Sequence, residues 1–454
     1  MKSAAFALIA ALVAGPAAAR TIEAPATPGR AAAALAAAAD GDTVRLASGV
    51  HAGPLTLAHR IVLRGAPGAI VDGGGNGCVL TVLASGAEVS DLAIRSSGRR
   101  VITIDAGLRV LSAQNVHLSR LRLTDVLYGI YAERADGLVA SDCTLTGRVP
   151  AGREDGEGNG IHLWYTGGAR LLRDDVSHFQ DAIYLSFAAG THAESSLLHD
   201  NGRYGFHTMY CQSGRLIGNT FTHNVAGCAI MFSNQLEISG NQFIHNRGPR
   251  TYGLLLRDCS DGRFENNALV DNTIGMFLDD SNRNRMVGNL IQDNGWGVLM
   301  FSSCAGNEFT RNAFINDDYA LALDMKYTSN RLDDGRIGNY WSENTPYDLD
   351  ADGVSDAPYS PVGTFAFLSK QYPDLSVLAK SPAVAALAVA EQVLPARRPS
   401  EAVDRRPLVA PPALAIPPTA RAPRAATRAP WGAAAFGAIA LGSLGALRRR
   451  RGGA

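Results

Sequence analysis

Residues 218–224 read GNTFTHN and residues 240–246 read GNQFIHN, so nearly the same seven residues return after 22 positions. The asparagine of this motif recurs at spacings of 22, 26, 22 and 23 residues, at Asn219, Asn241, Asn267, Asn289 and Asn312. A second landmark, the small residue that opens each short apolar run, keeps the same rhythm at Gly129, Gly160, Ala182, Gly205, Gly227, Gly253, Gly275, Gly297 and Ala320. Two landmarks that share one irregular rhythm indicate a repeat architecture.

The length of the repeat and its short apolar runs decide between repeat folds. Leucine-rich repeats have this length but need a run of leucines, and helical repeats are longer and show a 3.6-residue period. The sequence therefore predicts an all-β chain, a right-handed parallel β-helix with coils of about 22 residues stacked at the strand spacing of a sheet. We expect nine or more coils over 129–330, one asparagine ladder, and a short capping helix within 28–39.

Alternation along each strand separates core from surface. The first and third residues after each small landmark form two apolar columns, which predicts that Met276, Met300 and Cys228 are packing residues. The second and fourth residues should point outward. These outward columns contain Tyr131, His162, Tyr184, His207, Trp164, Met209 and Met231.

Three outward residues on neighbouring coils form a candidate metal site. Met209 and Met231 share one column, and His207 lies two residues before Met209 on the same face. Two thioethers and an imidazole suit Cu(I), so the pattern predicts a transient copper site at His207, Met209 and Met231. The alternative is a hydrophobic outer face covered by an insertion such as 147–159.

A second candidate site lies in the sequence DLDADGVSD, residues 348–356. Asp348, Asp350 and Asp352, followed by Gly353, resemble the start of a calcium loop, and Asp356 adds a fourth carboxylate. Position 12 of such a loop is Tyr359 rather than glutamate, which excludes a standard EF-hand. The stretch predicts either a weak structural Ca²⁺ site or a turn in which aspartates cap their own backbone.

Charge is spread unevenly along the 454 residues, although the formal net charge is zero. Residues 20–394 carry 30 basic and 40 acidic side chains, a net charge of about −10. Phosphate binding requires clustered Lys and Arg, so we expect no nucleic-acid partner.

The two ends of the chain predict export and anchoring. Residues 1–19 have the layout of a signal peptide, and 20–394 form the β-helix domain with its caps. Residues 395–430 hold nine prolines, which predicts a linker. Residues 431–447 are predicted to be a transmembrane anchor, and residues 448–454 a basic cytoplasmic tail. This order predicts a periplasmic body anchored to the inner membrane; the alternative for the tail is a sorting signal that is removed. The six cysteines show no CxxC spacing and leave disulfide pairing open.

The closing stretch GNYWSENTPYDLDADGVSDAPYSP, residues 338–361, resembles the terminal motif of the NosD family. With the leader and the repeats, the resemblance covers about residues 30–368, although this motif also occurs in other surface β-helix proteins. The resemblance implies an exported, non-enzymatic β-helix protein required to mature nitrous oxide reductase, which supplies copper or sulfur for assembly of the copper centres. It also implies the partners: an ABC permease with its ATPase, a copper chaperone that feeds the assembly, and the reductase as target. A C-terminal anchor departs from the soluble form expected of that family.

Two other classes of protein remain open from the residues alone. A β-helix carbohydrate enzyme, a lyase, hydrolase or epimerase, would need acids such as Glu133, Asp174, Asp175, Asp258, Asp279 and Asp280, with Arg257 as a basic neighbour. Adjacent acids are also common in turns, so the pattern is weak. A surface adhesin is the third class.

Overall fold

The computed structural model describes residues 19–324, 328–372, 375, 378, 381–393 and 401–414. The predicted signal peptide and the predicted anchor at 431–447 lie outside these residues, apart from Ala19. Among the described residues, no helix is long and apolar enough to span a membrane.

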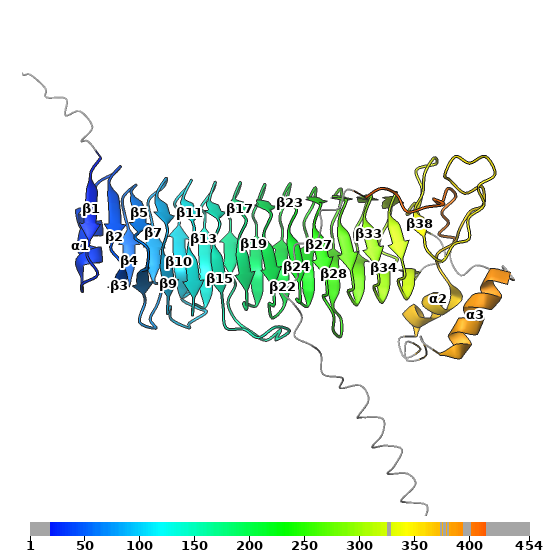
Figure 1. The fold of residues 1–454 in the computed structure, drawn as a ribbon, viewed down its shortest axis with the longest axis horizontal. Helices are drawn as coiled ribbons and strands as arrows, with labels where there is room; N and C mark the ends of the chain where they lie inside the picture. Colours follow the sequence, from blue (N-terminus) through cyan, green and yellow to red (C-terminus); the bar gives the residue numbers. More distant parts are fainter. Residues whose placement is uncertain are drawn as a thin grey trace, which may run out of the picture. The chain divides into compact units, whose positions relative to one another are not determined.

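The described chain is a parallel β-helix whose three sheets run along the stack of coils (Figure 1). Sheet 1 has 13 strands. They are β1 (Thr21–Ala24), β2 (Thr43–Leu46), β5 (Val62–Gly65), β8 (Glu88–Ser90), β11 (His117–Ser119), β14 (Val139–Ser141), β17 (Arg170–Leu172), β20 (His192–Glu194), β23 (Arg215–Ile217), β26 (Glu237–Ser239), β29 (Arg263–Glu265), β32 (Arg285–Val287) and β35 (Glu308–Thr310).

Sheet 2 has 12 strands and carries the outward columns of the sequence analysis. They are β4 (Leu55–Leu57), β7 (Leu80–Val82), β10 (Ala106–Leu111), β13 (Tyr128–Glu133), β16 (Ile161–Trp164), β19 (Asp181–Ser186), β22 (Tyr204–Met209), β25 (Ala226–Met231), β28 (Tyr252–Arg257), β31 (Ile274–Asp279), β34 (Trp296–Met300) and β37 (Tyr319–Leu323).

Sheet 3 has 13 strands. They are β3 (Gly49–Ala52), β6 (Ala69–Asp72), β9 (Ala93–Arg95), β12 (Arg122–Thr124), β15 (Thr144–Thr146), β18 (Asp175–Ser177), β21 (Leu197–His199), β24 (Thr220–Thr222), β27 (Gln242–Ile244), β30 (Ala268–Val270), β33 (Leu290–Gln292), β36 (Ala313–Ile315) and β38 (Tyr340–Trp341). The right-handed parallel β-helix is thus confirmed, and β13 to β37 supply the nine coils expected over 129–330.

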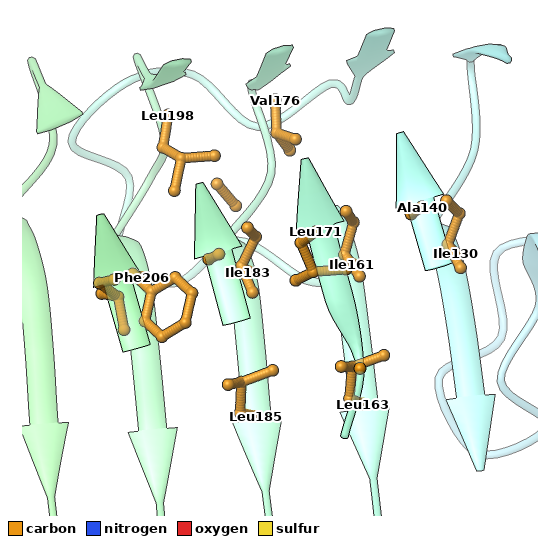
Figure 2. Packing of buried hydrophobic residues seen from close by; sticks show 14 of the residues in the cluster. Ile130, Ala140, Ile161, Leu163, Leu171, Val176, Ile183, Leu185, Leu198 and Phe206 are labelled. Atoms are coloured by element: carbon orange, nitrogen blue, oxygen red, sulfur yellow. The ribbon is translucent and has the colours of Figure 1, made fainter. Parts of the chain in front are cut away.

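The small landmark residues allow the coils to approach one another closely. A Cβ added to Gly227 would lie 2.6 Å from the carbonyl oxygen of Gly253 on the next coil. Inside the stack, the predicted apolar columns are buried; Figure 2 shows Ile130, Ile161, Ile183 and Phe206 following one another from coil to coil. Met276, Met300 and Cys228 are core residues, as predicted.

The predicted asparagine ladder is present. Asn219 donates its backbone N–H to Oδ1 of Asn241 over 2.9 Å, and the pattern repeats through Asn267, Asn289 and Asn312 to Asn339. A second ladder, which the sequence analysis missed, runs five residues further along each coil at Asn201, Asn224, Asn246, Asn272 and Asn294. Both ladders satisfy buried backbone groups at the turns of the coil.

Caps close both ends of the stack. The expected N-terminal helix is α1 (Arg30–Ala37), which buries Ala31, Ala34 and Leu35 over the first coil. At the other end lie α2 (Thr364–Gln371), which contacts β37, and α3 (Pro382–Val393). Figure 1 shows α1 and this helical pair at opposite ends of the described coils.

The predicted linker at 395–430 needs a correction over residues 402–408. Leu408 forms β-bridges with Tyr340 and Val354, and Ala402 and Asp404 are buried. Oδ2 of Asp404 accepts hydrogen bonds from the Asn339 backbone and the Trp341 indole, 2.8 Å each. Part of the proline-rich stretch therefore completes the C-terminal cap, because the last asparagine of the ladder needs an acceptor.

All six cysteines are free thiols, and five of them are buried. Burial raises the pKa of the thiols of Cys143 and Cys259 to about 12, so they stay protonated at neutral pH. The cysteines act as small packing residues of the core and turns.

Candidate functional site

The outer face of sheet 2 brings together the three predicted copper ligands. Met209, at the end of β22, is the register partner of Met231, at the end of β25. His207 lies two residues before Met209 on β22, so all three side chains leave the same face of the sheet. Met209 and Met231 are half-buried, whereas His207 is 7% exposed.

His207 is held by a buried carboxylate. Its Nδ1 lies 3.0 Å from Oδ2 of Asp181, and Arg203 donates two further hydrogen bonds to the same carboxylate, of 2.9 and 2.7 Å. Burial raises the pKa of Asp181, but the hydrogen bonds from Arg203 and His207 outweigh burial and leave that pKa below its usual value. The second ring nitrogen of His207, Nε2, is buried without a hydrogen-bond partner among the described residues. Histidines that bind metals commonly have a carboxylate on one nitrogen and a free second nitrogen.

The imidazole of His207 ends a column of rings that contact one another in tilted or edge-to-face geometry. Tyr131, His162, Tyr184 and His207 follow one another across β13, β16, β19 and β22, with ring centroids 4.8, 4.7 and 4.8 Å apart. Burial lowers the pKa of His162 to about 4, so its ring is neutral at neutral pH. The next residue in this column is Ala229, a small side chain that ends the stack.

The insertion at 147–159, which the alternative interpretation expected to cover this face, contacts the residues just before and between these strands. The carbonyl of Glu154 accepts a hydrogen bond of 3.3 Å from the Gln180 side chain, and the Gly152 N–H donates one of 3.3 Å to the carbonyl of Asn201. These contacts place the loop just before β19 and β22. Met209 and Met231, at the ends of β22 and β25, are partly exposed to solvent.

A second ring stack flanks the methionines and was not predicted. It occupies the turn that follows sheet 2, where Tyr165, Phe187, Tyr210 and Phe232 stack face to face at 4.7, 5.1 and 5.0 Å. Each ring belongs to the fifth residue after a small landmark, so the repeat rhythm already contained the signal. We call these four residues the ring ladder.

The structure gathers three of the four predicted calcium ligands. Carboxylate oxygens of Asp348, Asp350 and Asp356 lie within 4.8 Å of one another. Asp352 is not part of this group. All four aspartates accept hydrogen bonds from backbone N–H groups of the same stretch: Asp348 from Gly353, Asp350 from Asp352, Asp352 from Val354 and Asp356 from Leu349. The stretch therefore has both of the features considered, three neighbouring carboxylates and aspartates that cap their own backbone.

The acids considered for carbohydrate chemistry lie on two different sheets. Asp175 begins β18 of sheet 3 and pairs with His199 at 3.1 Å, while Asp279 ends β31 of sheet 2 and lies 3.3 Å from Arg257. Asp174 is buried in a turn, where burial raises its pKa to about 7. Asp258 and Asp280 directly follow β28 and β31, so they share the sheet of Asp279 and not that of Asp175.

Comparison with known proteins confirms the resemblance to the NosD family. The family model described as periplasmic copper-binding protein (NosD) matches residues 149–346. A Pseudomonas aeruginosa protein described as a probable ABC transporter binding protein NosD is 29% identical over 395 residues, 83% of this chain and 90% of the relative. A Stutzerimonas stutzeri protein of the same description is 26% identical over 381 residues, 80% of this chain and 86% of the relative.

At least one solved structure shares the fold. The catalytic unit of a GH87 α-1,3-glucanase from Streptomyces thermodiastaticus superposes with a TM-score of 0.54 at 13% identity, covering 72% of this chain and 71% of that chain. The A-module of the Azotobacter vinelandii mannuronan C-5 epimerase AlgE6 gives a TM-score of 0.49 at 14% identity, covering 65% and 90%. At such identities the likeness concerns architecture alone.

Proposed function

This chain is a homologue of the NosD proteins, and on that premise we propose that it is an exported accessory protein for the maturation of nitrous oxide reductase. The proposal has it work with an ABC permease and ATPase in the periplasm, as a supplier of copper rather than as an enzyme. The descriptions of its relatives as ABC transporter binding proteins and of its family as periplasmic and copper-binding support this role.

The observation that carries the copper role is the register of Met209 and Met231 beside His207. Methionine side chains are long and unbranched, so two on neighbouring strands can converge without a backbone shift. Nε2 of His207 has a free lone pair once Nδ1–H donates to Asp181. Thioethers and imidazole favour Cu(I) over hard cations, and three neutral ligands would hold it weakly enough for release.

Copper binding can be tested with a paired substitution. Met209→Leu with Met231→Leu conserves volume and hydrophobicity, so the fold should persist. We expect this variant to lose Cu(I) in anaerobic competition with a chelator and to lower copper loading of nitrous oxide reductase. The matched control is Met276→Leu with Met300→Leu, two methionines buried in the core. Equal Cu(I) binding by the outer variant and the parent would contradict the site.

Two further assignments accompany this proposal. A weak structural Ca²⁺ would be held by Asp348, Asp350 and Asp356, so Ca²⁺ should raise the melting temperature of the parent but not of Asp350→Asn.

Residues 431–447 would anchor the body to the inner membrane, so a chain that ends at residue 430 should appear in the soluble periplasmic fraction. Unchanged melting, or unchanged fractionation, would count against the respective assignment.

A further inference from the structure

A column of residues with metal-binding side chains lies in the turn that follows sheet 3. Asp200, His223, His245 and Asp271 directly follow β21, β24, β27 and β30, and the ends of these strands are register partners. All four residues have left-handed φ angles, of 52°, 56°, 57° and 55°. Because successive coils are about 4.8 Å apart, each side chain lies beside the next. The column therefore runs carboxylate, imidazole, imidazole, carboxylate across four coils.

The two adjacent imidazoles each have one nitrogen held by a neighbour. The ring centroids of His223 and His245 lie 5.9 Å apart, and both side chains are exposed. Nδ1 of His245 lies 2.5 Å from Oδ2 of Asp271, and Nδ1 of His223 lies 3.0 Å from the hydroxyl oxygen of Thr222. Neither Nε2 atom hydrogen-bonds a described residue. When each Nδ1–H donates to its partner, both Nε2 atoms have a lone pair for a metal.

Asp200 presents a carboxylate oxygen beside these imidazoles. Its Oδ2 lies 2.6 Å from Nδ1 of His199, whereas its Oδ1 hydrogen-bonds no described residue. His199 is not a ligand candidate, because its Nε2 lies 3.1 Å from Oδ1 of Asp175 and both of its nitrogens are therefore occupied. The hydrogen bonds from His199 to Asp175 and Asp200 raise the pKa of this imidazole. Asp200 is thus fixed through one oxygen and open at the other.

Asp271, at the other end of the column, has both carboxylate oxygens occupied. The Arg247 guanidinium donates to its Oδ1, and Nδ1 of His245 faces its Oδ2. Arg247 also donates a hydrogen bond of 3.1 Å to the backbone carbonyl of Asp271. This carboxylate therefore orients the imidazole of His245 without being a ligand itself. Carboxylates commonly hold metal-binding histidines in this way.

The donor atoms in this column select the kind of cation. Two imidazole nitrogens and one carboxylate oxygen suit Zn²⁺, whereas Cu(I) prefers thioethers and Ca²⁺ prefers a set of oxygens. We propose that Asp200, His223 and His245 form a Zn²⁺ site, with Asp271 as a positioning residue and water at the fourth coordination position. Two nitrogens on one tetrahedral Zn²⁺ lie about 3.3 Å apart, which exposed imidazoles on neighbouring coils reach by side-chain rotation alone. The site lies on sheet 3 and is independent of the methionine pair on sheet 2.

Zinc binding can be measured by calorimetry on the full-length, untagged protein in detergent, with excess Ca²⁺ present to occupy the aspartates of 348–356. His223→Asn with His245→Asn introduces side chains that tolerate the left-handed region, so the fold should persist. We expect Zn²⁺ affinity to fall at least tenfold in this variant. Co²⁺ bound to the parent in place of Zn²⁺ should show the visible absorption of a tetrahedral site, and the variant should lack it.

The positioning role of Asp271 has its own test. Asp271→Asn keeps the turn conformation but replaces the carboxylate that faces Nδ1 of His245. Loss of such a partner typically lowers metal affinity by 10- to 100-fold, so we expect about a tenfold fall in Zn²⁺ affinity and a changed Co²⁺ absorption. Unchanged affinity and absorption would refute the role of Asp271.

A matched control removes two exposed histidines elsewhere in the β-helix. His59→Asn with His117→Asn should leave Zn²⁺ affinity unchanged. Equal Zn²⁺ affinity of the His223, His245 variant and the parent would overturn the inference, as would an equal loss in the control. Met209→Leu with Met231→Leu should bind Zn²⁺ as the parent does, so failure of the copper site and failure of the zinc site are separate results.

Discussion

At the scale of single residues, burial changes what a polar side chain can do. His162 lies between Tyr131 and Tyr184, with its ring tilted against the first and edge-to-face with the second. Its Nδ1 accepts a hydrogen bond of 3.1 Å from the Asn159 amide when the ring is neutral. His207, two coils further on, instead has the carboxylate of Asp181 on its Nδ1. The two imidazoles occupy one column of the sheet, but different neighbours suit one to packing and the other to metal binding.

The lowered pKa of His162 predicts a pH dependence of stability. The unfolded imidazole titrates near pH 6.5, and the folded one near pH 4. Between these values the unfolded state binds the extra proton, so the free energy of unfolding should fall as pH drops from about 6.5 to 4. Denaturant unfolding at several pH values should show this loss, and His162→Gln should reduce the slope. The same slope in His162→Gln and the parent would assign the effect to other groups; His223→Gln, on an exposed turn, is the control.

At the scale of elements, the asparagine ladders connect successive coils in the turns between their paired strands. Asn267 is 1% exposed. Its Oδ1 accepts from the backbone and side chain of Asn241, and its Nδ2 donates to the carbonyl of Ile238 over 2.8 Å. Asn267 thus connects the coil before it, through Asn241 and Ile238, with the coil after it, through Asn289, as an extra strand pairing would.

Substitution of one buried ladder asparagine should lower the free energy of unfolding more than substitution of an exposed asparagine. Asn267→Leu leaves the Asn241 N–H and the Ile238 carbonyl without partners in a buried turn. We expect a loss of about 1–3 kcal/mol for each group left unsatisfied, measured by denaturant unfolding. Asn76→Leu, at an exposed turn, should change stability by less than about 0.5 kcal/mol. Similar losses for the two variants would show that the ladder adds nothing to coil stacking.

At the scale of the whole described body, its two ends are closed by different means. At the N-terminal end α1 covers the apolar core. At the C-terminal end the Trp341 ring stacks on Phe314 at 4.2 Å, and its indole donates to Asp404. Asp404 also accepts from the Asn339 N–H, so one carboxylate completes both the ladder and the cap.

Removal of that carboxylate should release the closing segment. Asp404→Ala leaves the Trp341 indole and the Asn339 N–H unpaired, so we expect residues 402–408 to detach and stability to fall by about 2–4 kcal/mol. Limited trypsin digestion should then cut faster after Arg405, with a rise in solvent quenching of tryptophan fluorescence; the Arg406–Pro407 bond resists trypsin. Glu401→Ala, an exposed neighbour, is the control. Unchanged digestion of Asp404→Ala would show that the β-bridges of Leu408 hold the segment alone.

Much of the architecture could be predicted from the sequence because a solenoid is built from local rules. Each coil repeats the same small landmark, the same alternation and the same asparagine, so spacing alone predicted the stacked coils and the outward direction of His207, Met209 and Met231. The NosD resemblance also came from sequence, through the closing motif at 338–361.

Only the tertiary structure decided features that depend on residues far apart in the chain. The partner of His207 is Asp181, 26 residues away, and the partner of Trp341 is Asp404, 63 residues away. Neither pairing follows from the repeat, because the repeat specifies which way a side chain points but not which neighbouring polar group meets it. The same holds for Asp352, which lies outside the group formed by Asp348, Asp350 and Asp356, although all four accept backbone hydrogen bonds within the stretch. Periodicity determines direction, whereas contacts depend on how loops and caps fold back on the coils.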